Sequence, residues 1–103
     1  MQGKGIRFVI TETHLHPHIR ARMEQRGITL EEIQKTFNEG WDAADAKPNV
    51  LGKVKAFVYG TEWEGKFYRE KEVTVYFRKT DKGITLLTAK ARYGQGFSRS
   101  AVK

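Results

Sequence analysis

The chain has 103 residues and no cysteine, and 19 Lys and Arg against 12 Asp and Glu give a formal net charge of +7. This length predicts one domain over residues 1–103, and the lack of cysteine excludes disulfides, thiolate metal sites and a cysteine nucleophile. No apolar run approaches the ~20 residues of a membrane span, and the first residues lack the apolar stretch of a secretory signal. We therefore expect a cytoplasmic protein that makes no membrane contact.

The positive charge is concentrated toward the end of the chain, including a basic tail at about residues 94–103. No Asp or Glu follows Asp81, whereas this part contains Lys82, Lys90, Arg92, Arg99 and Lys103. A region of one charge sign attracts phosphate better than the same charge scattered over a surface. The composition therefore indicates nucleic acid or another polyanion as a partner.

Residues 5–11 (GIRFVIT) alternate between an apolar and a mixed side. Ile6, Phe8 and Ile10 share the apolar side, and a period of two residues is typical of a strand with one buried face. The sequence therefore predicts an N-terminal strand.

Two short helices joined by a glycine turn are predicted next. Pro17 fits the first turn of a helix, where its missing N–H costs nothing, and a glycine directly after Arg26 ends this helix. Thr29 and Glu32 match a capping box that begins a second helix, which ends at Gly40. Together the two elements predict a helical hairpin.

The remaining chain predicts a loop and a β-meander. Residues 41–52 contain a proline and several small or acidic residues, so we expect an irregular loop. Segments rich in Val, Tyr, Phe and Thr predict strands over residues 53–59, 67–79 and 84–93, with the charged run 70–72 on solvated surface. The fold class is α+β: an N-terminal strand, a two-helix hairpin packed on the sheet, and a three-stranded antiparallel meander.

The first predicted helix carries a polar ridge of His18, Arg22 and Arg26. At 100° per residue these lie at 0°, about 40° and about 80°, next to the apolar stripe of Ile19 and Met23. A histidine flanked by cations at the edge of a core is placed to exchange a proton near a bound phosphate. The alternative is an ordinary solvated helix surface with a histidine at the helix start.

The last predicted strand changes from apolar to cationic along one face. Regular alternation places Thr88, Lys90 and Arg92 on the same face as Ile84 and Leu86. If this face meets the first helix, its cations converge with the helix ridge on one cleft, where they would stabilise developing negative charge on a phosphate. The alternative is a sheet edge with solvent-facing Lys and Arg, which resists aggregation.

Three histidines alternate at His14, His16 and His18. On a continuing strand all three would project to one side as metal ligands, but Pro17 predicts a helix start, which breaks the alternation. The nearby glutamates complete no recognised metal motif. We therefore expect a role at the start of the helix, and neither a metal nor another cofactor.

Aromatic residues near basic ones suggest contacts with RNA, since bases stack on exposed rings. Trp63 lies at a predicted hairpin tip, and Tyr93 and Phe97 lie near the basic tail. Aromatic residues at strand spacing belong more often to a core. The residues that we expect to bind RNA are Arg26, Trp63, Tyr93 and Arg99.

The helical hairpin also carries a motif, His18-Ile19-x-x-Arg22-Met23-x-x-Arg26-Gly27-Ile28-Thr29-x-Glu31-Glu32-Ile33. It resembles the opening of a family of small uncharacterised domains in which such a hairpin precedes a three-stranded meander. That family looks related to the barnase–EndoU–colicin–RelE (BECR) superfamily of metal-independent RNases, which includes toxin-like domains of the RelE and BrnT type and phage-associated domains. The resemblance covers about residues 5–93.

By position, the resemblance assigns catalytic roles to His18 and Arg22 on the helix and to Thr88, Lys90 and Arg92 on the final strand. It implies a toxin-like or phage-associated endoribonuclease that cleaves RNA to a 2′,3′-cyclic phosphate without a metal. The histidine would act as general acid or base, and the cations would stabilise the transition state. An acidic antitoxin or immunity protein is the expected inhibitor.

Two departures from the family pattern leave alternatives open. His14 and His16 precede the motif histidine, and the final strand lacks a Thr or Ser near its end, so the acid for the leaving group is unassigned. The alternative function is a non-catalytic RNA- or protein-binding accessory module on the same fold. The sequence is compatible with a monomer or with a dimer paired through a strand edge.

Overall fold

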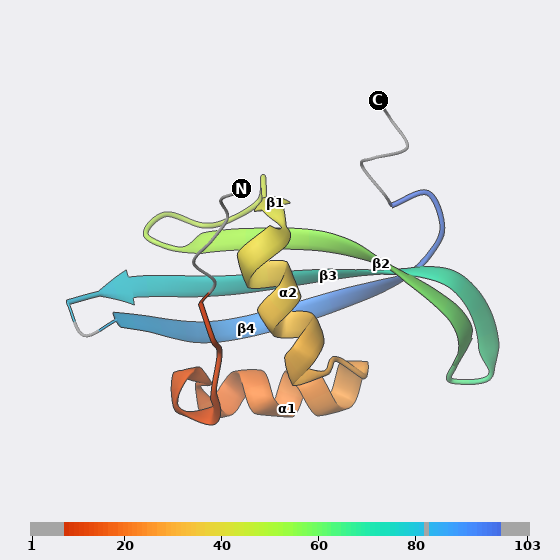
Figure 1. Ribbon diagram of the computed structural model, residues 1–103, viewed down its shortest axis with the longest axis horizontal. Helices are drawn as coiled ribbons and strands as arrows, with labels where there is room; N and C mark the ends of the chain where they lie inside the picture. Colours follow the sequence, from red (N-terminus) through yellow and green to blue (C-terminus); the bar gives the residue numbers. More distant parts are fainter. Residues whose placement is uncertain (1–7, 82, 98–103) are drawn as a thin grey trace.

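Two α-helices and a four-stranded antiparallel sheet make up the described residues, 8–81 and 83–97, of this computed structural model (Figure 1). The elements are a short 3₁₀ helix η1 (Glu12–His14), α1 (Pro17–Arg26), α2 (Leu30–Glu39), β1 (Trp41–Asp42), β2 (Leu51–Trp63), β3 (Lys66–Thr80) and β4 (Gly83–Gly94). The strands follow the order β1-β2-β3-β4. The predicted α+β class is confirmed.

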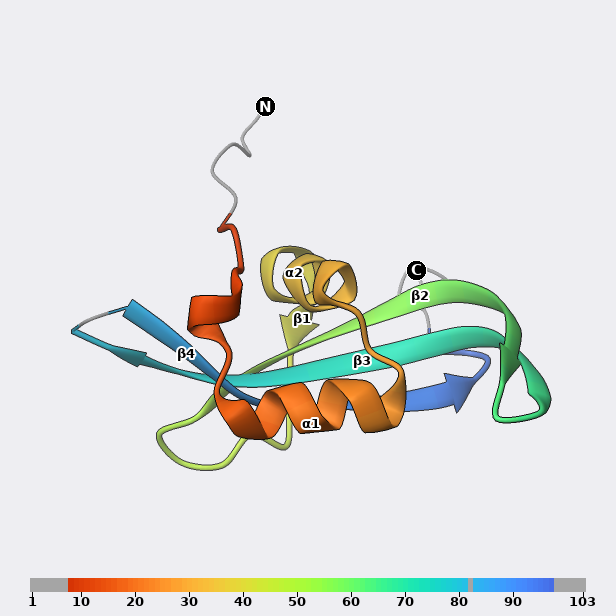
Figure 2. The same cartoon turned by 90° about the horizontal axis from the view of Figure 1, so that it is seen from below.

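The helices cover one side of the sheet. α2 packs across β2 and β3, and α1 runs along β4, one of the two edge strands. Figure 2 shows α2 on one side of the strands and the loop of residues 43–50 on the other. We call the side that carries this loop the open face. In the described residues no helix is both long and apolar enough to cross a membrane.

Both predicted helices are confirmed, and their ends have the expected caps. α1 begins at Pro17 and ends at Arg26, and it is followed by the C-cap Gly27, which adopts the left-handed conformation with φ 69°. At the start of α2, the Thr29 hydroxyl accepts a hydrogen bond from the backbone N–H of Glu32, whose carboxylate accepts from the backbone N–H of Thr29. These local interactions stabilise the helical hairpin independently of the sheet.

The N-terminal segment is not the predicted strand, as far as the structure describes it. The backbone N–H of Phe8 donates to Asn38 Oδ1 (2.8 Å), and that of Ile10 donates to Gln34 Oε1 (3.0 Å). Both acceptors are side chains of α2. The alternation identified the buried side correctly, since Ile10 is buried. The prediction of a strand is wrong here because side chains of a helix, rather than a neighbouring strand, satisfy the backbone.

The loop predicted over residues 41–52 contains a short strand. Within β1, Trp41 pairs with Val54 of β2 and Asp42 pairs with Lys53. The three predicted strands of the meander are confirmed. β3 and β4 extend one residue further at each end than expected, whereas β2 extends well beyond the predicted 53–59, to Leu51–Trp63. The segment between β1 and β2 is irregular, as predicted.

A register shift in β4 determines the face on which its side chains lie. Val75 of β3 pairs with Ala89, whereas Phe77, two residues further, pairs with Leu86. β4 therefore has one extra residue between the two pairs, and an extra residue reverses the alternation of side chains. Leu86 and Ala89 both lie in the core. Side chains that a regular strand would place with Leu86 lie beyond this bulge on the open face.

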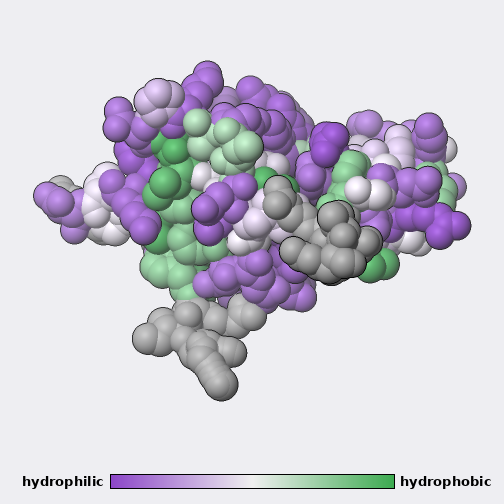
Figure 3. All heavy atoms as spheres, turned by 90° about the horizontal axis from the view of Figure 1, so that it is seen from above, coloured by the Kyte–Doolittle hydropathy of each residue, from purple (hydrophilic) through white to green (hydrophobic). Residues whose placement is uncertain are grey.

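The apolar core lies between the sheet and the helices. Ile19 of α1, Ile33 of α2 and Leu86 of β4 are completely buried within it. Most of the surface in Figure 3 is hydrophilic, with apolar side chains gathered in a few areas. Leu51 and Val58, two of the exposed large apolar residues, lie at different parts of β2. These two exposed apolar side chains therefore belong to separate regions of the strand.

A lysine is also buried against the helical hairpin. Lys71 of β3 is 1% exposed, and its Nζ donates to the Gly27 carbonyl (2.5 Å) and to Glu32 Oε1 (2.8 Å). The rings of Tyr59 and Tyr93 lie 5.4 and 5.5 Å from the ammonium. The prediction of solvated surface for this charged run is wrong for Lys71, because its side chain lies on the face that packs against the hairpin.

Replacing Lys71 with Met tests this buried ion pair. Removing one partner of such a pair costs about 3–5 kcal/mol, because the other charge loses its compensation. We expect Lys71→Met to lower the free energy of unfolding, measured by urea denaturation, by that amount. Lys55→Met is the matched control, since Lys55 pairs with Glu39 at 3.5 Å in a more exposed position, and should cost less than about 1 kcal/mol. Equal losses would contradict a special contribution of Lys71.

Candidate functional site

The polar ridge of α1 (His18, Arg22 and Arg26) borders the outer edge of β4. Arg26 Nη1 donates to the Ala89 carbonyl of β4 (2.7 Å), which holds the helix beside the strand. His18 is exposed, and Arg22 is partly exposed with Nη1 donating to Gln25 Oε1 (2.8 Å). Among the described residues neither arginine has a carboxylate partner. The ridge predicted from helical periodicity therefore presents uncompensated positive charge.

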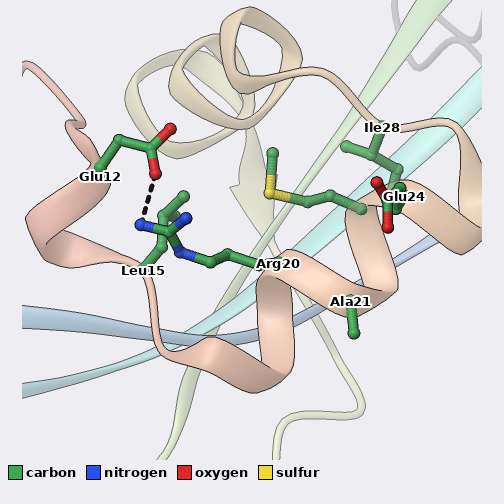
Figure 4. Close-up of a pocket in the computed structure, with 7 residues that line it drawn as sticks. Glu12, Leu15, Arg20, Ala21, Glu24 and Ile28 are labelled. Atoms are coloured by element: carbon green, nitrogen blue, oxygen red, sulfur yellow. Dashed lines mark ion pairs between the residues drawn. The ribbon is translucent and has the colours of Figure 1, made fainter.

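The opposite flank of α1 differs in its electrostatics. It lines a pocket of about 350 Å³ beside η1 (Figure 4). Here Arg20 forms an ion pair with Glu12, and Leu15 and Ile28 contribute apolar surface. Because its arginine is neutralised, this flank is less suited to a phosphate than the ridge is.

The histidine run lies at the start of α1, as predicted. His14 Nδ1 accepts from the backbone N–H of Thr11 (2.9 Å), and His16 Nδ1 caps the helix by accepting from the backbone N–H of His18 (3.0 Å). A neutral imidazole that accepts at Nδ1 carries its hydrogen on Nε2. The exposed His16 ring therefore has an N–H donor available at Nε2. Within residues 8–81 and 83–97, no three His, Asp or Glu side chains are grouped closely enough to hold a metal ion.

Thr88, Lys90 and Arg92 lie on the open face of the sheet and not against α1. The bulge in β4 places them there, so the predicted convergence on one cleft with the helix ridge is not formed. The helix ridge and these three side chains instead lie on opposite sides of β4. Ala89, which accepts the hydrogen bond from Arg26, stands between Thr88 and Lys90.

Lys90 is paired with a carboxylate from the 43–50 loop. Its Nζ lies 2.9 Å from Asp45 Oδ2, and the Tyr76 hydroxyl donates to Asp45 Oδ1 (2.9 Å). The hydrogen bond from Lys90, followed by that from Tyr76, lowers the pKa of Asp45 below its ordinary value. The hydrogen bond of Lys90 with Asp45, followed by its interaction with Tyr76, raises the pKa of Lys90. The loop thus neutralises this cation in the free protein.

Arg92 is paired as well. Its Nε donates to Glu72 Oε1 (2.8 Å), and its guanidinium lies 4.7 Å from the ring centroid of Phe97. The hydrogen bond to Glu72 and its negative charge raise the pKa of Arg92. Both cations of β4 that the sequence assigned to a catalytic role therefore have acidic partners.

The two aromatic residues expected to bind RNA pack on each other. The rings of Trp63 and Tyr93 are stacked, with centroids 5.1 Å apart and planes 9° from parallel. Trp63 also lies so close to Gly27 that a Cβ there would stand 2.4 Å from Trp63 Cζ3, and the Tyr93 hydroxyl donates to the Arg26 carbonyl (2.6 Å). These contacts cover ring surface that base stacking needs and join the sheet to the helix turn.

Sequence reasoning missed the acidic partners on the open face. Glu72 is directly opposite Arg92 in the β3–β4 register, so a correct register would have found this pair. Asp45 lies in an irregular loop, whose path has no local signal. Arg99, another expected RNA-binding residue, lies outside the described residues.

Comparisons of the chain with protein-family models, curated proteins and solved structures return no match. The resemblance to the family of small domains therefore rests on the hairpin motif. The function of the protein is therefore inferred from the arrangement of side chains around α1 and β4.

The partly buried phenol of Tyr93 makes the free energy of unfolding depend on pH. Burial, followed by electrostatic repulsion from Tyr59, Glu32 and Glu64, raises the pKa of Tyr93 above its ordinary value of 10.0. A phenol with a raised pKa in the folded chain contributes stability that is present below the unfolded value and is lost as the pH rises above it. We expect the free energy of unfolding to decline more steeply above about pH 10 in wild type than in Tyr93→Phe. Urea denaturation across this pH range measures the free energy of unfolding of both proteins. If the two free energies declined in parallel with pH, the expectation would be contradicted.

Proposed function

We propose that this protein is a metal-independent endoribonuclease that holds RNA phosphates along the polar ridge of α1. One observation carries the proposal: the exposed imidazole of His18 lies one helical turn from Arg22, an arginine without a carboxylate partner among the described residues. Side chains four residues apart on a helix are neighbours, with Cβ atoms about 5–6 Å apart. A phosphodiester held by the arginine therefore lies within reach of the histidine. The net charge of +7 favours the encounter with RNA.

The chemistry needs no protein nucleophile, because RNA supplies its own 2′-hydroxyl. In the proposed reaction His18 takes the proton from this hydroxyl, and the 2′-oxygen attacks the adjacent phosphorus. The bond from phosphorus to the 5′-oxygen breaks, which leaves a 2′,3′-cyclic phosphate. The leaving oxygen takes the Nε2 proton of His16 in its imidazolium form, in which Nδ1 is also protonated and has released the backbone N–H of His18. Arg22 and Arg26 stabilise the negative charge that develops on the non-bridging oxygens.

Lys90, Arg92 and Thr88 have no part in the transition state of this mechanism. They lie across β4 from the ridge, and both cations have acidic partners. The proposal differs here from the residue roles that the family resemblance implies. The proposal includes a toxin-like or phage-associated role, which the hairpin motif supports. It also includes an acidic antitoxin or immunity protein as the inhibitor.

Cleavage of transfer RNA and a synthetic messenger RNA in EDTA tests the ridge. We expect His18→Ala to lower the rate about 10²-fold or more, and Arg22→Ala about 10²-fold. Arg20→Ala is the matched control, because it removes the same side chain from the opposite flank of the same helix. Identical purification keeps any contaminating nuclease equal in all preparations. Equal cleavage by wild type and His18→Ala would remove this residue from the mechanism, and loss of activity in EDTA would favour a metal site.

His16 can be tested separately as the acid for the leaving group. His16→Asp retains a side chain that caps helices well but does not donate a proton at neutral pH. We expect it to slow RNA cleavage about 10²-fold. A nucleoside 3′-(4-nitrophenyl phosphate) has a leaving group that needs no proton, so this variant should cleave it at the wild-type rate. Slow cleavage of both substrates would indicate that His16 has only a structural role.

The second candidate is a non-catalytic RNA-binding module. The pairing of both β4 cations with carboxylates favours it, since it leaves no cation of this strand free for a transition state. In that case wild type cleaves neither substrate, yet Arg22→Ala still weakens the binding of an uncleavable oligonucleotide and Arg20→Ala does not.

A further inference from the structure

Two pockets on the open face of the sheet meet at one ion pair. The first has a volume of about 360 Å³ and the second about 400 Å³, and both are lined by Asp45 and Lys90. The first pocket also contains Lys47, Tyr76 and Thr88. The second also contains Trp41, Glu72 and Arg92. The contact between Asp45 Oδ2 and Lys90 Nζ (2.9 Å) therefore separates two halves of one groove.

We propose that this groove binds the phosphodiester backbone of single-stranded RNA, and that Asp45 occupies the position of one phosphate in the free protein. The inference rests on the proposed function, because it extends the surface for the same RNA. It gives Asp45 the role of an internal competitor, which RNA must displace before it reaches Lys90.

The contacts of Asp45 are those of a phosphate. One carboxylate oxygen faces the Lys90 ammonium, and the other accepts a hydrogen bond from the Tyr76 hydroxyl. Two oxygens of a phosphodiester present the same charge and the same acceptors to these groups. The site is therefore already arranged for an oxyanion, and the loop supplies one.

Displacing Asp45 from Lys90 costs little free energy. The side chains of Asp45 and Lys90 are 59% and 47% exposed, and exposed ion pairs contribute little to stability. Asp45 lies in the irregular segment between β1 and β2, so its movement breaks no pairing in the sheet. A polyanion that brings several phosphates at once competes well with a single carboxylate.

The opened groove has the residues that RNA requires. Lys47 is exposed and has no carboxylate partner among the described residues, and the Thr88 hydroxyl lies in the same pocket as Lys90. The groove also adjoins the candidate site, because the Ala89 carbonyl that receives Arg26 lies on the same strand between Thr88 and Lys90. One RNA strand passing over the edge of β4 reaches both the ridge and the groove.

The test is binding of a fluorescent 2′-O-methyl oligonucleotide, which cannot be cleaved, to wild type, Asp45→Asn and Glu31→Gln. Asp45→Asn preserves an acceptor for Tyr76 and frees Lys90. Glu31→Gln is the matched control, since it removes one negative charge from another exposed pair with a lysine, on α2. We expect Asp45→Asn to bind about threefold to tenfold tighter than wild type, with a salt dependence steeper by about 0.7 in log–log slope. The control should show a smaller gain, and the double variant Asp45→Asn/Lys90→Gln should lose the gain.

Each outcome distinguishes the groove from the ridge. Equal affinity of Asp45→Asn and Glu31→Gln for the oligonucleotide overturns RNA binding in the groove. This holds even if Arg22→Ala weakens binding and so supports RNA binding along the ridge. Tighter binding by Asp45→Asn, without any loss of affinity in Arg22→Ala, supports RNA binding in the groove and overturns RNA binding along the ridge. If Asp45→Asn gains affinity for polyglutamate but not for the oligonucleotide, the groove binds an acidic protein and the RNA assignment is wrong.

Discussion

The buried ammonium of Lys71 is the interaction on which the arrangement of this fold depends. A charge inside a protein is costly unless it is paired and hydrogen-bonded, and Lys71 meets both conditions at the helix turn. It binds the carbonyl of Gly27 and the carboxylate of Glu32, and that carboxylate also caps α2 through the N–H of Thr29. One acidic group therefore begins a helix and fastens it to the sheet. Because α1 ends at the same turn, this contact also sets where the polar ridge lies relative to β4.

The parts of the fold that are predictable from sequence have local causes. Pro17, the capping box of Thr29 and Glu32, and the alternation along the meander each act within a few residues, and the structure contains all of these elements. The errors have distant causes. The backbone at Phe8 is satisfied by a side chain 30 residues away, and β1 exists only because β2 passes beside it. A pattern within one segment carries no information about such partners.

The candidate site also has features that the sequence predicts and features that it does not. The ridge of α1 was predictable, because the helical period alone places His18, Arg22 and Arg26 on one flank. The buried position of Lys71 was not predictable, since it depends on Glu32, which is 39 positions away in the chain. Nor was the pairing of Lys90 with a loop carboxylate. The electrostatic character of a surface depends on which cations have found acidic partners, and this is a property of the tertiary structure.

The bulge in β4 did leave a trace in the sequence. Ile84 and Leu86 are apolar in one phase of the alternation, whereas Ala89, Ala91 and Tyr93 are apolar in the other. A regular strand cannot bury both groups. It would bury either the first group together with two cations against the helices, at a cost of several kcal/mol for each unpaired charge, or the second group, which would expose Ile84 and Leu86. One extra residue resolves the conflict, because it keeps both apolar groups on the helix side and moves the cations to the open face. The same bulge that completes the core therefore gives this edge strand a helix ridge on one side and, on the other, two cations that are each paired with a carboxylate.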